Sequence, residues 1–370
     1  MNKTILIVVV IILILVGGFV YFQQQKEMNL PVKEGISAIE EGAKEVVAGE
    51  YHTCVLLKDG TIKCWGLNYE GWTLCNGTTN DSSSPVPVLG IDNAIQVSVG
   101  GDETSAILSD GTVKGCGIQF DSSIPVLVPG ISNAIQVSIG GLHYCVLLKD
   151  KTVKCRGGNN YGQLGDGTTK SRSVLGLIPG LNDVIQISTG YNHTCALLSN
   201  GTIKCWGENE YGQLGNGVTE DSLGPVSVSG VLNAIQISAG DFHTCALLNS
   251  GEIKCWGWNI GGQLGDGTTN NHSTPVLVSE ITNAKQIDAG AMHNCALLSD
   301  RTIKCWGANR FGMLGDGTTE TKLIPVPVLG ITDAVQISAG GSHTCAVLGN
   351  GAVKCWGENE YGQLGIGTTD

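Results

Sequence analysis

The chain has 370 residues, of which 54 are glycine and only 5% are aromatic. This composition favours many short strands and tight turns over helices or a disordered chain. The formal net charge of −12 argues against nucleic acid as a partner, because contact with phosphates requires clustered Lys and Arg.

Residues 5–22 form an uninterrupted, uncharged apolar segment, "ILIVVVIILILVGGFVYF". Its length suits a helix that crosses a bilayer core of about 30 Å. The segment is longer than the apolar region of most signal peptides, and no A-x-A-like site follows it, so an uncleaved signal anchor is favoured over a cleaved peptide. Lys3 then favours a cytoplasmic N-terminus, with residues 1–4 as a short cytoplasmic tail and the rest of the chain outside.

Residues 44–370 consist of seven related units. Their matching positions are His52, Glu103, His143, His193, His243, His293 and His343, in steps of about fifty residues. The second unit is shorter, because it lacks the "YGQLGDGTT" segment seen elsewhere. Within residues 183–228, the stretches "DVIQIST", "TCALL", "TIKCW" and "PVSV" have the apolar pattern of strands and are bounded by turn residues. Each unit therefore supplies four strands.

A four-stranded sheet with two apolar faces cannot be stable alone, whereas seven sheets stacked around an axis cover one another's faces. The predicted fold is all-β: a seven-bladed β-propeller of four-stranded blades, preceded by one N-terminal transmembrane helix. A linear β-solenoid is the alternative, but its rungs are usually much shorter than these units.

The two ends of the repeat region complement each other. The last unit ends at "GQLGIGTTD" without an outer strand, and "NLPVKEGI", residues 29–36, precedes the first unit. We expect the segment around Pro31 and Val32, within a linker covering residues 23–43, to complete the seventh blade and remove an open sheet edge. A truncated gene product is the alternative explanation.

Most of the fourteen cysteines occur in pairs at one position of the unit. The pairs are Cys54 with Cys64, Cys145 with Cys155, Cys195 with Cys205, Cys245 with Cys255, Cys295 with Cys305, and Cys345 with Cys355. The turn "SNG" predicts a hairpin loop that ends on a left-handed Gly201, and this register places Cys195 opposite Cys205. Facing Cα atoms there approach to about 4.5 Å, which is within disulfide range.

The second unit tests this interpretation, because its equivalents are Ser105 and Gly115, so that both partners are missing together. The two remaining cysteines, Cys75 and Cys116, are available for a seventh bridge between units. Such bonds persist in oxidising compartments. Metal binding by His193, Cys195 and Cys205 is the alternative, but three ligands need a fourth and no CxxC motif is present. We therefore favour disulfides over metal.

The histidines and tryptophans of the repeat are interpreted as structural. A buried hydrogen bond to a neighbouring turn is the simplest role for the histidines, which whole sheets hold apart. Tryptophans recur at one position of the blade, where large rings fill the space between sheets: Trp65, Trp206, Trp256, Trp306 and Trp356.

The pattern "AGxxHTCALL…G…CWGxNxxGQLGxGTT…PVxV" resembles the regulator of chromosome condensation repeat over about residues 44–370. The chain is similar to a prokaryotic-type, cysteine-containing member of that family with an N-terminal membrane anchor. The resemblance implies a seven-bladed propeller, but members of the family differ in function. They include exchange factors for a small GTPase, light sensors, accessory parts of ubiquitin ligases and bacterial inhibitors of β-lactamases.

Candidate binding residues lie where the units differ. No nucleophile elbow, phosphate-binding loop or catalytic carboxylate pair stands out, so we expect neither an enzyme nor a cofactor or metal. The residue before each marker position is variable and often apolar, as suits protein recognition on one face of the propeller. These residues are Tyr51, Asp102, Leu142, Asn192, Phe242, Met292 and Ser342. A second variable set follows "CWG" and is expected on another rim: Glu208, Glu210, Trp258, Arg310, Glu358 and Glu360.

The sequence thus predicts a single-pass membrane protein with a monomeric, extracytoplasmic propeller that binds a protein ligand. The membrane contact is through residues 5–22. A module that binds surface glycans is a near alternative. The family resemblance adds two others, a guanine-nucleotide exchange regulator of a small GTPase and an inhibitor of the β-lactamase-inhibitor type.

Overall fold

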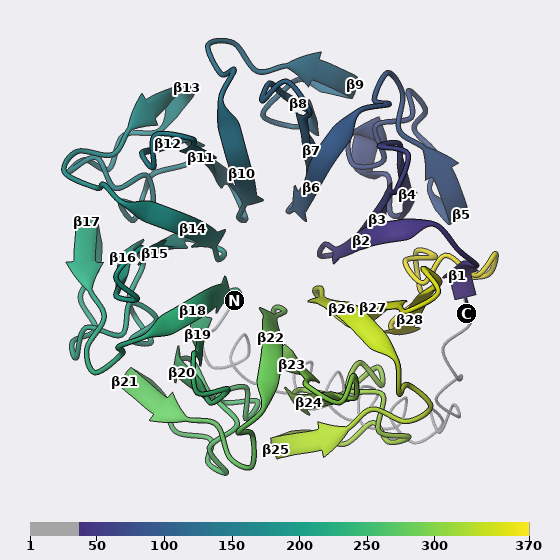
Figure 1. Ribbon diagram of the computed structural model, residues 1–370. Helices are drawn as coiled ribbons and strands as arrows, with labels where there is room; N and C mark the ends of the chain where they lie inside the picture. Colours follow the sequence, from purple (N-terminus) through teal and green to yellow (C-terminus); the bar gives the residue numbers. More distant parts are fainter. Residues whose placement is uncertain (1–36, 370) are drawn as a thin grey trace, which may run out of the picture. The chain divides into compact units, whose positions relative to one another are not determined.

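The computed structural model describes residues 37–369, which form seven four-stranded antiparallel sheets around a central axis (Figure 1). Each sheet is one blade, and in six blades the chain runs from the innermost strand outward in sequence order. The predicted all-β, seven-bladed propeller is confirmed.

The four strand positions of the blade recur with nearly constant length. The innermost strands are β2 (Ala43–Ala48), β6 (Ala94–Gly100), β10 (Ala134–Ile139), β14 (Val184–Thr189), β18 (Ala234–Ala239), β22 (Ala284–Ala289) and β26 (Ala334–Ala339). The second strands are β3 (His52–Leu57), β7 (Glu103–Leu108), β11 (His143–Leu148), β15 (His193–Leu198), β19 (His243–Leu248), β23 (His293–Leu298) and β27 (His343–Leu348).

The third strands are β4 (Ile62–Gly66), β8 (Val113–Gly117), β12 (Val153–Gly157), β16 (Ile203–Gly207), β20 (Ile253–Gly257), β24 (Ile303–Gly307) and β28 (Val353–Gly357). The outer strands are β5 (Ser82–Pro87), β9 (Ser122–Leu127), β13 (Arg172–Leu177), β17 (Ser222–Ser227), β21 (His272–Leu277), β25 (Lys322–Pro327) and β1 (Ser37–Ile39). A short 3-10 helix, η1 (Tyr69–Gly71), follows β4. In the second blade β8 leads almost directly into β9, which accounts for the shorter unit.

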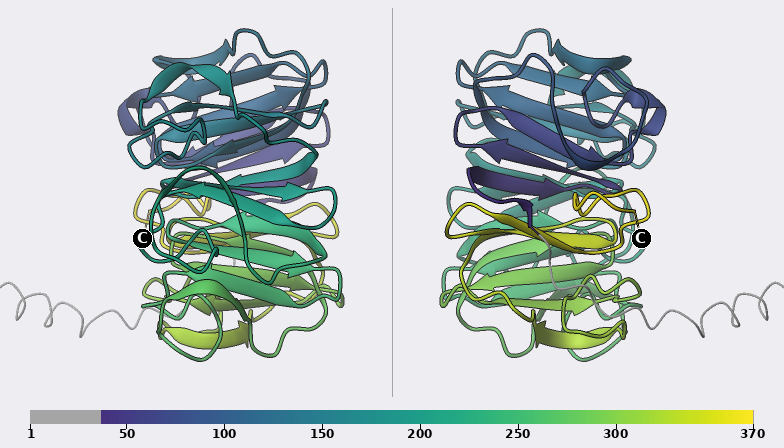
Figure 2. Two further views of the ribbon diagram at one scale, coloured as in Figure 1. Left: turned by 90° about the vertical axis from the view of Figure 1, so that its left-hand side faces the viewer. Right: turned by 90° about the vertical axis from the view of Figure 1, so that its right-hand side faces the viewer.

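The hydrophobic core lies between neighbouring sheets, which stack face to face in the side views (Figure 2). At the junction of the third and fourth blades, Leu147, Ile187 and Trp206 belong to one buried cluster. The indole Nε1–H of Trp206 also donates to the Gln163 carbonyl of the preceding blade, at 2.9 Å. The tryptophans therefore fill the space between blades as expected, and truncating such a ring to alanine typically costs about 3–5 kcal/mol.

The ring closes through the N-terminal segment. Strand β1 pairs with β28, with Ser37 opposite Lys354 and Ile39 opposite Val353, so the last blade also has four strands. The closing strand lies further along the chain than the expected Pro31 and Val32, which fall outside the described residues. Closure by an N-terminal strand covers the edge of β28 that would otherwise be unpaired.

The expected membrane anchor, residues 5–22, also lies outside the described residues. Within residues 37–369, no helix is both long and apolar enough to span a bilayer.

Candidate functional site

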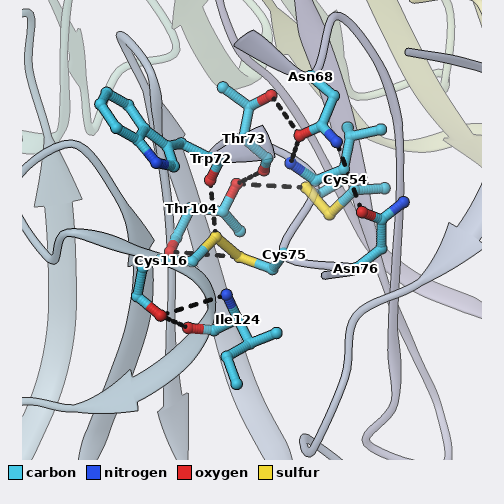
Figure 3. The surroundings of a disulfide bond; sticks show 12 residues. Cys54, Asn68, Trp72, Thr73, Cys75, Asn76, Thr104, Cys116 and Ile124 are labelled. Atoms are coloured by element: carbon cyan, nitrogen blue, oxygen red, sulfur yellow. Dashed lines mark hydrogen bonds between the residues drawn. A yellow bond between two sulfur atoms is a disulfide. The ribbon is translucent and has the colours of Figure 1, made fainter. Parts of the chain in front are cut away.

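Disulfides hold the two central strands of six blades together. Cys195 on β15 faces Cys205 on β16, and their Cα atoms lie 4.1 Å apart. The other five hairpin pairs have the same Cα separation. A bond between Cys75, in the loop after β4, and Cys116, on β8, joins the first two blades (Figure 3).

The disulfide bonds bear on the alternative that the paired cysteines bind a metal ion. The described residues include no free cysteine and no group of three or more His, Cys, Asp or Glu side chains that could hold an ion. Sulfur atoms in disulfides are not thiolates and do not bind zinc. The hairpin geometry therefore supports disulfide bonds at the paired positions.

The repeat histidines form a second constant feature. Each is buried, and its Nε2 atom lies 2.7–3.0 Å from a side-chain oxygen on the next blade: His52 contacts Thr104, His143 contacts Thr194, His193 contacts Thr244, His243 contacts Asn294, His293 contacts Thr344 and His343 contacts Thr53. The partner is thus a strand side chain on the next blade, rather than the neighbouring turn that we expected.

The hydroxyl partners fix the tautomer of these rings. The Thr194 hydroxyl donates its proton to the Gln163 carbonyl at 2.9 Å, so it can only accept from His143. The proton of His143 is therefore on Nε2, and the buried Nδ1 has no hydrogen-bond partner. Burial lowers the pKa of His143 to about 3, which keeps the ring neutral.

The junction of the second and third blades departs from this pattern. Glu103 stands at the histidine position and Tyr144 at the threonine position, and the Arg156 guanidinium lies 4.7 Å from the centre of the Tyr144 ring. The ring of Phe120 packs beside Gly115, at the place where a hairpin disulfide lies in the other blades. A Cβ atom on Gly115 would collide with this ring, so a cysteine does not fit there. Burial raises the pKa of Glu103 to about 7 despite the nearby positive charge of Arg156.

A ring of amide side chains ties the innermost strands together near the axis. Gln186 donates to the Ile237 carbonyl at 3.0 Å and accepts from the Ile237 amide at 2.8 Å. The same pair of hydrogen bonds to the next blade is made by Gln96, Gln136, Gln236, Gln286 and Gln336. In the first blade Glu45 takes this place and accepts from the Val97 amide.

The residues before the marker positions lie in the loops that join the innermost strand to the second strand. Tyr51 and Leu142 are 36% and 53% exposed, whereas Asp102, Phe242, Met292 and Ser342 are half-buried. Asn192 lies beneath this surface at 9% exposure, where its amide donates to Glu208 at 3.2 Å. Asn192 therefore supports the surface instead of presenting a side chain to a partner.

The second variable set lies on the same side of the blades as the first, so our expectation of a separate rim is wrong. The rings of Phe242 and Trp258 are 5.8 Å apart, and those of Tyr51 and Tyr361 are 5.6 Å apart. In an antiparallel blade the first and third strands run in the same direction, so their C-terminal ends lie at one edge. We call the surface formed by the two sets of loops the variable face.

Four rings form an aromatic cluster on the variable face: Tyr191, Tyr211, Phe242 and Trp258. Their contacting centroids lie 5.7–5.9 Å apart, within the range of favourable aromatic pairs. Tyr191 is 39% exposed, and the other three rings are half-buried. The cluster is thus held by its own contacts while part of it remains open to solvent.

The variable face surrounds one end of the propeller axis. A cavity of about 190 Å³ lies there, and its lining includes Glu50, Tyr191, Asp241 and Asp288. Burial raises the pKa of Asp241 to about 7, and the negative charge of Glu50 acts in the same direction. Burial also raises the pKa of Glu50, although its Tyr51 hydrogen bond opposes the shift.

Comparison with known families agrees with this geometry. The model of the RCC1-like domain matches residues 119–370, and the regulator of chromosome condensation (RCC1) repeat matches residues 43–71. The chain belongs to the RCC1-like domain family. A search of curated proteins found no match to this RCC1-like propeller.

Solved structures share the fold of this RCC1-like propeller at low sequence identity. Prp20p from Saccharomyces cerevisiae is 20% identical, with a TM-score of 0.73, over 85% of this chain and 81% of that chain. Human WBSCR16 is 21% identical, with a TM-score of 0.74, over 86% and 87% of the two chains. The CRINKLY WD40 ectodomain of the Arabidopsis thaliana receptor kinase ACR4 is 20% identical, with a TM-score of 0.53, over 87% and 96%.

Some residues of the candidate site were missed by the sequence analysis. Tyr191 occupies a position held by Glu50 and Asp241 in other blades, and Tyr211 lies within the "NxYGQLG" pattern. The replacement of a small or acidic residue by tyrosine was a usable signal at position 191. At position 211 the same residue type recurs in other units, so the sequence did not mark it as special.

Proposed function

We propose that this RCC1-like propeller is a non-enzymatic, membrane-anchored, extracytoplasmic protein that binds a protein partner through its variable face. The observation that carries the proposal is the convergence of two variable loop sets on one face, with an aromatic cluster among them. Partly exposed aromatic rings that are already fixed in place are typical anchors of protein interfaces, because little side-chain entropy is lost on binding.

The disulfides support the extracytoplasmic part of the proposal. All fourteen cysteines lie in the described region, and all are paired. Disulfides of this number persist in oxidising compartments and are reduced in the cytosol. The apolar segment of residues 5–22 supplies a means of anchoring such a protein at the outer side of a membrane.

A regulator of a small GTPase is the second candidate, because Prp20p shares this fold and is described as binding Gsp1p and histones. Such a regulator would meet its GTPase in the reducing cytosol, where the disulfide frame would not persist. Recognition of a surface glycan would use the same aromatic cluster, so the binding experiment must separate protein from sugar.

The proposal is tested with the full chain in detergent, used to capture partners from the surface fraction of its native cells. A variant that combines Tyr51→Ser, Leu142→Ser, Phe242→Ser and Met292→Ser should lose capture of its specific protein. The loss is expected because the apolar contact area of the face is removed. Protease treatment of the captured material distinguishes a protein from a glycan.

A matched control changes exposed apolar residues of the outer strands instead. It combines Leu127→Ser, Val174→Ser, Leu177→Ser and Leu277→Ser, each of which removes an exposed side chain away from the variable face. This control should capture as the unmodified chain does, and circular dichroism should show both variants folded. Undiminished capture by a folded variant of the face would refute the proposal.

A further inference from the structure

The aromatic cluster adjoins the axial cavity on the variable face. Tyr191 belongs to the cluster and also lines the axial cavity, where its backbone amide donates to the Asp241 carbonyl at 3.2 Å. Asp241 immediately precedes Phe242, whose ring contacts three others of the cluster. The segment from Asp241 to Phe242 therefore connects the lining of the axial cavity with the aromatic cluster.

The charged side chains that line the cavity beside these rings are acidic, and they become negative as they ionise. Asp241 and Glu50 line the cavity, and none of the described residues that line it is basic. Glu208 accepts a hydrogen bond from Asn192, which follows Tyr191 in the chain. Burial raises the pKa of Glu208, and the negative charges of Asp221 and Glu210 add to the shift.

The opposite end of the innermost strands has different chemistry. There a cavity of about 540 Å³ lies along the starts of four innermost strands, β14, β18, β22 and β26, and its lining includes Ile185, Ile235, Lys285 and Val335. Among the described residues that line this cavity, Lys285 is the only charged one, and none is aromatic. Aromatic rings and carboxylates thus occur together at the cavity of the variable face, but not at the cavity on the opposite side.

We propose that the partner inserts a lysine or arginine side chain of a basic segment at the variable face, where its aliphatic stem lies across the aromatic cluster and its charged group reaches Asp241 and Glu50. This inference rests on the proposed function and specifies the chemistry of the partner. Aromatic faces attract cations, and the long stems of Lys and Arg pack well on rings. Carboxylates at the cavity complete the recognition through charge-assisted hydrogen bonds.

The direct test titrates the full chain in detergent with oligolysine and with the same peptide acetylated on every lysine. Oligolysine should bind and change the fluorescence of Trp258, and its affinity should fall as salt rises, because ions screen the attraction. Acetylation removes the positive charge but keeps the stem. We expect it to weaken binding at least tenfold, which corresponds to about 1.4 kcal/mol.

Variants locate the site. Asp241→Asn and Tyr211→Leu should each weaken oligolysine binding about tenfold. Two matched controls should leave it unchanged: Asp92→Asn, an exposed aspartate of the turn before β6, and Tyr161→Leu, the equivalent of Tyr211 in the third blade. Near-ultraviolet circular dichroism identifies any variant that has lost its fold. Tyr211→Phe keeps the ring and should retain binding.

Each contrary result is informative. Equal binding of the acetylated peptide, or equal losses in the matched controls, would overturn the cationic side chain as the ligand. A requirement for a neutral oligosaccharide in place of oligolysine would overturn it too. The proposed function is tested by a different experiment. It is refuted if the folded quadruple serine variant of the variable face captures its native partner as well as the unmodified chain does.

Discussion

At the scale of single residues, most of the repeated side chains bind a neighbouring blade. His193 contacts Thr244, Trp206 contacts Gln163, and Gln186 contacts Ile237, each across a junction between sheets. These polar contacts are buried or half-buried, so leaving one partner unpaired costs about 1–3 kcal/mol. The constancy of these residues is therefore explained by assembly of the ring.

Glu45 is the exception in the ring of glutamines. A charged carboxylate can accept from the Val97 amide but cannot donate to the carbonyl as glutamine does. Burial raises the pKa of Glu45 to about 7, above its ordinary value of 4.5. The stabilising contribution of this group is thus fully present below about pH 4.5 and is lost as the pH rises through 7.

We predict that Glu45→Gln stabilises the propeller by about 1 kcal/mol at pH 8, because the amide restores the missing donor. The gain should shrink as the pH falls from 7 to 4.5, where the native carboxyl becomes protonated. Denaturant unfolding at several pH values measures it. The reverse change in the fifth blade, Gln236→Glu, is the control and should destabilise at pH 8. A pH-independent effect of Glu45→Gln would contradict this explanation.

At the scale of elements, the disulfides differ in what they join. A hairpin bond such as Cys195–Cys205 links residues 10 positions apart, whereas Cys75–Cys116 links residues 41 positions apart on different blades. Closing a longer loop removes more entropy from the unfolded chain. The bridge between blades should therefore contribute more to the free energy of unfolding than a single hairpin bond.

We predict that Cys75→Ser with Cys116→Ser lowers the free energy of unfolding by about 4 kcal/mol, against about 3 kcal/mol for Cys195→Ser with Cys205→Ser. Chemical denaturation of the two double variants under oxidising conditions gives the comparison. An equal or smaller loss for the bond between blades would show that loop entropy does not control these contributions.

The strands and their register were predictable because turn residues and apolar alternation repeat in every unit. The closing strand was not, since "SAI" at Ser37–Ile39 is too short to show alternation. The departure at Glu103 and Tyr144 was visible only as separate substitutions, because the sequence alone does not show that these two strand positions lie at one junction between blades. The meeting of Phe242 with Trp258 followed from strand direction and could have been derived.

At the scale of the whole propeller, a constant frame supports one variable face. Contacts that join the last blade to the first include the pairing of β1 with β28, the hydrogen bond between Thr53 and His343, and the bond from the Trp65 indole to the Gln363 carbonyl at 2.8 Å. A closed ring has no terminal repeat with an exposed face, so it needs no capping repeat. The frame is then complete whichever residues the loops carry. This leaves the loops of the variable face open to change.

The central claim is that this frame is oxidised in the native protein and presents its variable face outside the reducing cytosol. The measurement that tests it most directly is the intact mass of the protein from its native membrane after thiol alkylation, with and without prior reduction. We predict that all fourteen cysteines are protected until reduction and are labelled afterwards. Labelling of the hairpin cysteines without reduction would contradict the claim and place the propeller in a reducing compartment.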